Sequence, residues 1–532
     1  MTYLLILLLL VPLLGAAVGA VLPSRGGIAR TWALAVALID LVIGAVIALN
    51  FDYQNPGVQF AYQGAAVDGI GFSFSLGIDS ISLWLVLLTV FLQPLAIAAS
   101  FEAIRDRAKD YYAWMNLLAV AMLGVFVARD VLLFYVFFEL TLIPMFFIIG
   151  IWGGPERRYA AGKFFLFTFT GSVFTLAVAI YLGLRAGSFD IAAVTSFAHS
   201  ATFSDTERWW VLLGFLAGFA VKVPLFPVHT WLPLAHTEAP TAGSVILAGV
   251  LLKLGTYGLL RLALPIGMIA PGSTAGATVA AFPVLMQFIG VLCLIGIIYG
   301  ALVAWVQQDI KKLVAYSSVS HLGFCVLGLV ALNDIGIGGS VLYMINHGLS
   351  TGAMFLVIGM IYDRYHTRDI NELSGLAQKM PKLAFFFVLF VLSSIGLPGL
   401  NGFVSEFLTI LGAFTSDTLG IGFGVIAALG IILGAVYMLH MTARVIWGPL
   451  KVPAVHGHGG EEQGHDAHGH GAGPGDIGRR EVAILVPLAI AVIVLGVMPR
   501  PVLKSMEAPV ESLRVSQATI PAPPVVAVAD SK

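Results

Sequence analysis

Long apolar stretches recur along the whole chain and are separated by short polar loops. A helix that crosses a lipid bilayer needs about 20 mostly apolar residues. By this criterion the chain contains fourteen candidate segments: residues 2–22, 31–50, 80–101, 112–128, 131–151, 163–184, 209–227, 242–264, 283–305, 311–332, 335–361, 383–413, 421–447 and 481–498. The pattern predicts an all-α polytopic membrane protein with about fourteen transmembrane helices.

The distribution of basic residues predicts which ends of these helices face the inner side of the membrane. When the N-terminus is placed outside, most of the 28 Lys and Arg residues fall in inward-facing loops, as expected from the positive-inside rule. Residues 105–109, 157–163, 311–312 and 479–480 hold examples. We therefore expect a multi-pass protein of the bacterial plasma (inner) membrane with both termini on the outer side.

Two of the predicted helices are interrupted. The seventh contains FAVKVPLFPVH, with Pro224 and Pro227, and the twelfth contains SSIGLPGLNGFVSEF, with Pro398. Proline removes a backbone donor and breaks a helix. Broken helices at membrane depth line protein or a wet cavity. Because the two breaks lie five helices apart, helices 4–8 and 9–13 are predicted to form an inverted repeat around an ion path.

This repeat divides the chain into five parts. We expect an N-terminal three-helix segment (1–110), a first five-helix unit (111–265) and a second, inverted unit (280–450). A His- and Gly-rich loop (451–480) and a last helix with its tail (481–532) follow. The tail from Pro499 is expected to be poorly ordered, and the loop, with histidines between 456 and 470, is expected to be solvated.

The amino-acid composition excludes several classes of function. Hydrophobic residues make up 59% of the chain and charged residues 11%, whereas soluble domains carry about 25% charged residues. The net charge of −1 gives no basis for nucleic-acid binding. Two isolated cysteines provide neither an iron–sulfur motif nor a metal site, and there is no dinucleotide or Walker A motif. We expect no cofactor and no metal in this chain.

Charged residues inside predicted helices are the candidates for chemistry. A charge at the bilayer centre costs about 2.5–3.5 kcal/mol on insertion scales. Four such residues stand out, namely Glu139, Lys222, Lys253 and Glu406. They either pair to hold helices together or exchange protons.

Two histidines extend this set. His321 follows Ser317 by one helical turn, and His347 precedes Ser350 and Thr351 by one turn. Polar groups at this spacing lie on one helix face, and histidine can relay protons near neutral pH. A hydrogen-bonded packing role is the alternative. His229, His236 and Glu238 are expected to shape the inner mouth of a half-channel, and Asp309 with Lys311 and Lys312 an interfacial charge cluster.

Four runs resemble a known family. They are KVPLFPVHTWLPLAHTEAPTAGSVILAGVLLKLGTYG, ARDVLLFYVFFELTLIP, QQDIKKLVAYSSVSHLGF and GLPGLNGFVSEF. They are similar to blocks of the antiporter-like membrane subunits of respiratory complex I, Mrp-type cation/proton antiporters and membrane-bound hydrogenases. The resemblance covers roughly helices 4–13.

The resemblance implies roles for the buried residues. Glu139 resembles the glutamate of the fifth helix, Lys222 the lysine of the seventh, and Lys253 the central lysine of the eighth. His321 and His347 resemble the polar link between two half-channels, and Glu406 the outlet residue. In such a path Lys222 exchanges a proton with the inner side, and Glu406 releases one outside.

The residue at 406 also separates members of this family. L- and N-type chains and Mrp antiporters typically carry lysine there, whereas M-type chains carry glutamate, as this chain does. The resemblance therefore implies a proton-translocating subunit of NADH:quinone oxidoreductase with no redox centre of its own. FMN, iron–sulfur clusters and quinone are expected in partner subunits, with L- and N-type chains as neighbours and lipid around them. An Mrp-type sodium/proton antiporter subunit, a membrane hydrogenase or formate-lyase subunit, and a non-conducting structural subunit are the alternatives.

Overall fold

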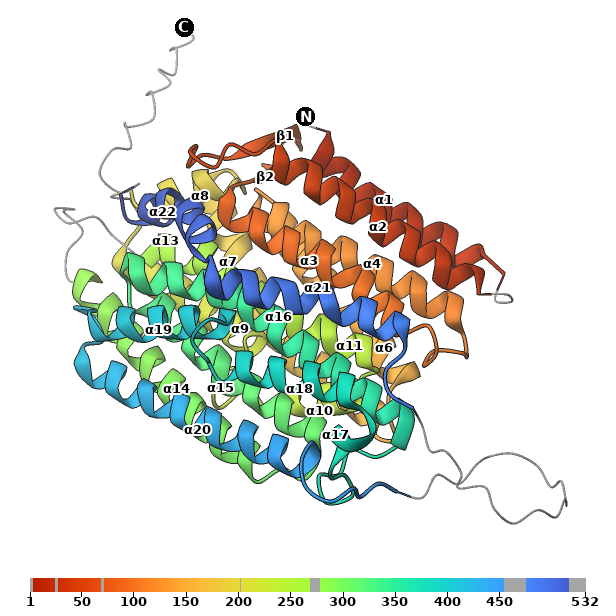
Figure 1. Cartoon of the computed structure of the whole chain (residues 1–532). Coiled ribbons are helices and arrows are strands. Elements are labelled where there is room, and N and C mark those ends of the chain that lie inside the picture. The colour runs from red at the N-terminus through yellow and green to blue at the C-terminus, as the bar shows by residue number, and fades with distance from the viewer. Residues whose placement is uncertain are drawn as a thin grey trace, which may run out of the picture.

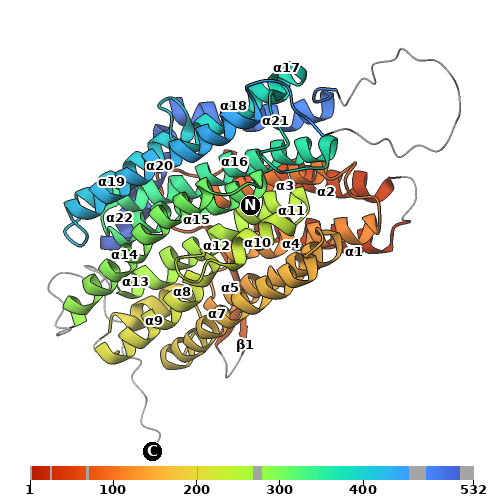
Figure 2. The same cartoon turned by 90° about the horizontal axis from the view of Figure 1, so that it is seen from below.

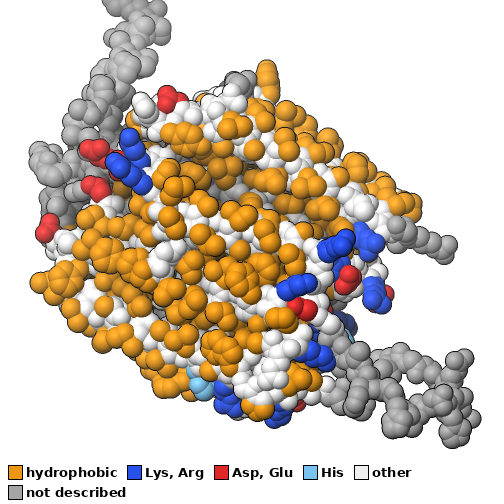
Figure 3. All heavy atoms as spheres, viewed as in Figure 1, with side chains coloured by type: hydrophobic (Ala, Val, Ile, Leu, Met, Phe, Trp, Pro, Cys, Tyr) orange, Lys and Arg blue, Asp and Glu red, His pale blue; other side chains and the backbone are white. Residues whose placement is uncertain are grey.

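The structure, a computed structural model, describes residues 3–23, 27–67, 71–200, 202–267, 278–453 and 475–515. Long helices run side by side through the molecule (Figure 1). On the face shown in Figure 3, apolar side chains cover the region between two ends where Lys, Arg, Asp and Glu gather. In the described part of the chain, twelve helices are long and apolar enough to cross a membrane. The predicted helical membrane fold is confirmed.

The N-terminal segment is a group of helices with a β-hairpin at one end. The helices are α1 (Leu4–Val21), α2 (Ile28–Leu49) and α3 (Ser80–Ala99), and the hairpin is β1 (Gln59–Val67) with β2 (Phe72–Ile78). The two strands pair antiparallel. This hairpin joins α2 to α3 and departs from the all-α prediction within the part of the chain that the structure describes.

The first five-helix unit contains more breaks than the sequence predicted. Its fifth span is divided at Thr141, and its eighth span contains two π-helical turns, η1 and η2. The predicted break of the seventh span is confirmed, because α9 ends at Lys222 and α10 begins at Trp231. The elements are α4 (Ala108–Val127), α5 (Val131–Leu140), α6 (Leu142–Trp152), α7 (Arg157–Ala186), α8 (Ile191–Ala198), α9 (Asp205–Lys222), α10 (Trp231–Glu238), α11 (Thr241–Ile246), η1 (Leu247–Leu251), α12 (Leu252–Gly258), η2 (Leu259–Ala263) and α13 (Leu264–Gly267).

The second unit has the same plan. Its twelfth span breaks between Ser394 and Asn401, where Gly396 and Gly399 take positive φ angles of 73° and 94°. Glycine adopts this left-handed conformation without steric cost. The elements are α14 (Thr278–Trp305), α15 (Ile310–Val330), α16 (Asp334–Tyr365), α17 (Leu376–Lys379), α18 (Pro381–Ser394), α19 (Asn401–Phe414) and α20 (Ile421–Val445). Figure 2 shows these helices lying beside those of the first unit.

Two aspartates mark the inverted relation of the units. The carboxylate of Asp130 accepts the backbone N–H groups of the first turn of α5, and that of Asp309 accepts those of α15. Asp130 forms an isolated β-bridge with Asp190, and Asp309 forms the matching bridge with Asp369. The first bridge lies near β2 and α8, and the second near α17, at opposite ends of the molecule (Figure 1).

The C-terminal part corrects one prediction. After α21 (Arg479–Val497), residues Arg500–Val515 form α22 instead of a poorly ordered tail. Its Ser505 accepts hydrogen bonds from Ser80 (2.6 Å) and Trp84 (2.9 Å) at the start of α3. The prediction missed this helix because it is amphipathic, with Val502, Met506 and Val510 buried. The histidines between 456 and 470 lie outside the described residues.

Candidate functional site

Lys222 is buried at the break of the seventh span. Pro224 and Pro227 follow it and end α9. Its Nζ donates a hydrogen bond to Thr141 Oγ1 (3.1 Å) at the division between α5 and α6. It also lies 4.8 Å from the centre of the Phe138 ring, a cation–π geometry that stabilises an ammonium group. Two chain breaks thus meet at this lysine.

Glu139 lies near Lys222 but does not form an ion pair with it. The two charges interact at longer range. Glu139 is only partly buried, and its Oε2 lacks a hydrogen-bond partner. The structural pairing that the sequence left open is therefore absent between these two described residues. The carboxylate interacts with the side chain of Ser172, and its second oxygen is left unpaired.

Lys253 is the most deeply buried charged group of the predicted set. It lies in α12 between the two π-helical turns and has no solvent-exposed surface. Such turns are frequent at functional sites. Its Nζ donates to the carbonyl of Ala248 and lies 2.7 Å from His347 Nδ1 on α16. Gly348 allows this approach, because a Cβ there would lie 2.7 Å from the carbonyl oxygen of Gly249.

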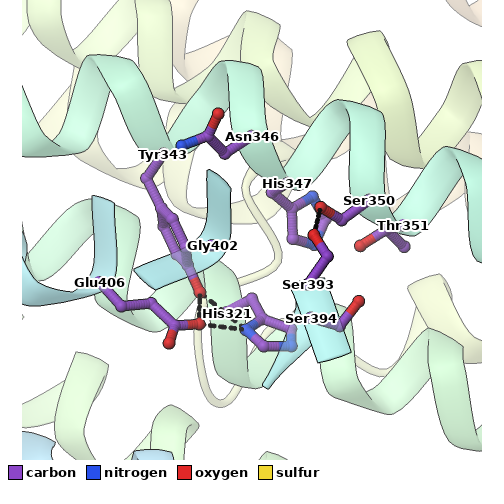
Figure 4. A pocket seen from close by; sticks show the side chains of 10 residues that line it. All are labelled: His321, Tyr343, Asn346, His347, Ser350, Thr351, Ser393, Ser394, Gly402 and Glu406. Carbon is purple, nitrogen blue, oxygen red and sulfur yellow. Dashed lines mark hydrogen bonds and ion pairs between the residues drawn. The ribbon is translucent and has the colours of Figure 1, made fainter. Parts of the chain in front are cut away.

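The polar line continues from His347 to Glu406. The ring centres of His347 and His321 are 5.7 Å apart. His321 Nδ1 lies 2.7 Å from the Tyr343 hydroxyl and 3.5 Å from Glu406 Oε1. The hydroxyl also donates to Glu406 Oε1 at 2.9 Å. Figure 4 shows the tyrosine, the histidine and the carboxylate converging on one point.

A small cavity runs beside this line. It has a volume of about 10 Å³, close to the smallest that holds a water molecule. His347 Nε2, Asn346 Oδ1 and Ser394 Oγ are buried there without a hydrogen-bond partner. Buried polar atoms are normally satisfied by protein or water. Unpaired polar atoms thus line a cavity that has room for about one water molecule beside His347.

A cluster of amide and hydroxyl groups supports the cavity wall. Asn346 Nδ2 donates to the carbonyl of Asn401 (2.7 Å) and to Ser405 Oγ (3.0 Å). Ser350 Oγ lies 2.7 Å from Ser393 Oγ. These contacts hold α16 against the broken twelfth span, so that Glu406 stays within reach of His321.

The structure brings four predicted residues together and leaves two apart. Lys253, His347, His321 and Glu406 form the continuous line just described. Lys222 lies on the adjacent helix, and a Cβ at Gly255 would lie 3.1 Å from Cβ of Lys222. Among the residues that the structure describes, no side-chain hydrogen bond connects Lys222 on α9 to Lys253 on α12.

Sequence analysis missed several polar groups. Tyr343 was not predicted, because the sequence around it does not show that its hydroxyl bridges two other helices. Lys311, expected in an interfacial cluster, is in fact buried. Asp40 is buried inside α2, with Oδ1 lacking a hydrogen-bond partner. A lone acid within ALAVALIDLVIGAVIAL was a visible signal.

Metal binding receives no support from the part of the chain that the structure describes. Within it no group of three or more His, Cys, Asp or Glu side chains is placed to hold a metal ion. His229 stacks on Phe226 with ring centres 5.7 Å apart, and His236 stacks on Phe355 at 4.7 Å. Both rings pack against aromatic side chains.

Family profiles match most of the chain. A profile described as "NADH:quinone oxidoreductase/Mrp antiporter, TM" matches residues 128–432. A second, "NADH-ubiquinone oxidoreductase chain 4, amino terminus", matches residues 59–128. The fold and the buried polar line thus define an antiporter-like membrane subunit.

Relatives with known names give the particular family. The chain is 42% identical over 513 residues to NADH-quinone oxidoreductase subunit M of Rhodobacter capsulatus, covering 94% of each chain. It is 40% identical over 508 residues to NADH-ubiquinone oxidoreductase chain 4 of Arabidopsis thaliana, covering 95% and 96%. The chain belongs to the family of NADH-quinone oxidoreductase subunit M, a proton-translocating membrane subunit of complex I.

Solved structures agree with this assignment. A chain of respiratory complex I from Thermus thermophilus superimposes with a TM-score of 0.82 at 28% identity, covering 97% of this chain and 100% of that one. A chain of the Mrp complex from Dietzia sp. superimposes with a TM-score of 0.81 at 22% identity, covering 96% and 97%. The second likeness is one of fold alone.

Proposed function

We propose that this chain carries protons along the buried line from Lys253 through His347 and His321 to Glu406. Lys253 passes a proton to Nδ1 of His347, and water in the adjacent cavity carries it toward His321. Glu406 then receives it, directly or through the Tyr343 hydroxyl, and releases it on the outer side. Each step joins groups within hydrogen-bond reach or one water apart, as proton transfer requires.

The hydrogen-bond contacts of Lys253 are the main support for this proposal. A lysine that only holds helices together needs a carboxylate to offset the loss of hydration. Lys253 contacts a carbonyl and an imidazole instead, and no carboxylate of the described residues forms an ion pair with it. A neutral imidazole next to an ammonium group is a proton acceptor. Relay therefore explains this arrangement better than pairing.

Glu139 and Lys222 serve as the switch of the line. A carboxylate that approaches a buried lysine stabilises its charged form, and one that moves away favours proton release. The free Oε2 of Glu139 and its partial exposure on α5 suit such a movement. A change of charge in a neighbouring subunit is then felt inside this chain.

The remaining assignments concern the assembly. Electron transfer belongs to partner subunits with FMN, iron–sulfur clusters and quinone, and this chain has no redox centre of its own. L- and N-type chains flank it in the bacterial inner membrane, with both termini outside. Within the chain, residues 111–265 and 280–450 are the two functional units. Residues 1–110, the loop 451–480 and the segment 481–532 surround them.

The Lys253→Arg variant tests the relay. Arginine keeps the positive charge but does not deprotonate in proteins. In the assembled complex, reconstituted in vesicles, NADH-driven proton pumping should fall at least about tenfold, the order expected for loss of an acid–base group. Lys253→Met should behave in the same way.

The exposed lysine at the start of α18 provides the control. Lys382→Met should leave pumping unchanged, since this side chain is exposed. Subunit composition after purification shows whether each variant assembles. An assembled Lys253→Arg complex that pumps like the wild type would exclude the relay and leave the structural role.

A further inference from the structure

A large polar cavity lies where α10 and α16 end. It has a volume of about 630 Å³. Its charged lining is mixed in sign and comes from several loops: Glu102, Arg105, Glu238, Lys311, Asp363 and Arg368. It lies at the end of the molecule where Asp309 and Asp369 form their bridge, because Arg368 contacts Asp309 at 3.1 Å. This surface cavity can hold many waters.

Lys311 forms the inner wall of the cavity. It lies in the first turn of α15, is 7% exposed, and donates from Nζ to the carbonyl of Ala239. The nearby Asp309 carboxylate caps α15 and pairs with Arg368 instead. Lys311 is therefore a buried ammonium group held by a neutral oxygen, and it forms no salt bridge with any residue that the structure describes.

His236 lies deeper than Lys311. It is completely buried on α10, and neither ring nitrogen has a hydrogen-bond partner. It is close enough to both Lys311 and Lys253 to interact with their charges. A buried imidazole with two free nitrogens, between two ammonium groups, is unusual in a packed interior. It can accept a proton on one nitrogen and donate from the other.

Contacts along helix α16 give the order of these three groups between the cavity and the centre of the molecule. Its His347 contacts Lys253, its Phe355 stacks on His236, and its Gly359 lines the cavity with Lys311. At 1.5 Å per residue, these positions are separated by about 12 Å and about 6 Å along the helix. Lys311, His236 and Lys253 therefore form a series from the cavity to the centre of the molecule.

We propose that protons reach Lys253 from this cavity through Lys311 and His236, without passing through Lys222. A proton from Lys311 or from cavity water binds one nitrogen of His236, and the opposite nitrogen releases its proton to water, which carries it to the neutral amine of Lys253. The ring returns to its first tautomer by rotation. This route rests on the proposed role of Lys253, and it makes Lys222 a switch and not a carrier.

A chemical rescue tests Lys311. In the complete complex, Lys311→Cys should lower proton pumping at least about tenfold. The cavity exposes the new thiol to methanethiosulfonate reagents. An aminoethyl reagent forms a mixed disulfide that restores a side-chain amine of similar length, and pumping should recover to at least half of the wild-type rate. A sulfonatoethyl reagent adds an anion and should restore nothing.

The neighbouring Lys312 is a matched control. It is exposed one residue further along α15, so Lys312→Cys should pump normally before and after either reagent. The wild-type complex treated in parallel corrects for other thiols. Normal pumping by Lys311→Cys, or a loss that the aminoethyl group does not restore, would overturn the proposal.

His236→Phe separates this route from the proposed function. Phenylalanine keeps the stacking on Phe355 but cannot carry a proton, so this variant should lose pumping as Lys311→Cys does. If Lys253→Arg stops pumping while the His236 and Lys311 variants pump normally, the access route is wrong and the relay stands. If Lys253→Arg itself pumps normally, both fail.

Discussion

The side-chain nitrogen of Lys253 lies 2.7 Å from Nδ1 of His347, although the two residues are 94 positions apart. One belongs to each five-helix unit, so this contact joins the two halves of the chain. A hydrogen bond between an amine and an imidazole shares a single proton. In the proposed relay, this contact is the point at which a proton crosses from the first unit to the second.

Replacing His347 should interrupt this crossing. His347→Gln keeps a polar side chain but removes the group that can bind and release a proton near neutral pH. We expect proton pumping to fall at least about tenfold. His440→Gln, at an exposed position on α20, should have no effect. Pumping by reconstituted complex measures both, and equal rates would contradict a relay through His347.

The Tyr343 hydroxyl should speed the last step. It lies 2.7 Å from His321 Nδ1 and 2.9 Å from Glu406 Oε1, whereas the direct distance from His321 to Glu406 is 3.5 Å. Tyr343→Phe leaves only the longer path, and a lost hydrogen bond to a charged group costs about 1.5–3 kcal/mol. Pumping should slow by about ten- to a hundredfold and not stop.

A second tyrosine beside His321 serves for comparison. The Tyr437 hydroxyl lies 3.4 Å from His321 Nε2 and does not bridge to Glu406 by a hydrogen bond. Tyr437→Phe should therefore change the pumping rate less than Tyr343→Phe. A larger effect at Tyr437 would show that the proton leaves His321 on the other side.

The difference between Tyr343 and His321 illustrates what sequence can predict. His321 was recognised because a titratable group with a polar neighbour one turn away is visible in a single helix. The role of Tyr343 depends on three helices meeting at one oxygen, and local periodicity carries no such information. Likewise the order of helices followed from hydropathy and the two breaks followed from proline, whereas no sequence pattern indicated the π-helical turns around Lys253.

For Lys311 the sequence predicted the wrong environment. Its position near Asp309 and Lys312 at the start of a predicted helix suggested an interfacial charge cluster. The loop after α10 covers it and supplies the carbonyl of Ala239. Long-range loop packing decided its burial, and hydropathy does not report that. His236 was assigned to the inner mouth because it follows the predicted seventh helix, but its unpartnered nitrogens became visible only in three dimensions.

The ion pair of Asp79 and Arg261 should make stability depend on pH. Burial alone would raise the pKa of the Asp79 carboxyl, but the charge of Arg261 and the N–H of Ser82 outweigh it, and the pKa is lowered. A lowered pKa in the folded state stabilises the protein fully above the unfolded value of about 3.9. This contribution is lost as the pH falls through the lowered value.

Asp79→Asn should remove that dependence. Asparagine still caps α3, but it leaves a buried guanidinium unpaired, which costs about 3–5 kcal/mol. The thermal midpoint of the purified complex in mild detergent is measured from pH 7 to pH 3. In the variant it should be lower than in the wild type at neutral pH, and the decrease that Asp79 causes at acid pH should be absent. Asp110→Asn breaks the exposed pair with Arg107 and should cost less than about 1 kcal/mol. Equal effects of both variants would argue against a special role for the buried pair.

The break of the twelfth span should position Glu406 through Gly396. A Cβ at Gly396 would overlap with Oε2 of Glu406, whereas a Cβ at Gly399 would meet nothing within 4 Å. Both glycines have positive φ angles, so an alanine at either costs about 1–2 kcal/mol of backbone strain. Gly396→Ala also displaces the carboxylate from His321 and should lower pumping at least about tenfold, whereas Gly399→Ala should be destabilised alike but pump normally. Comparing thermal midpoints with pumping rates separates strain from displacement, and a loss of pumping in both variants would assign the effect to the backbone of the break.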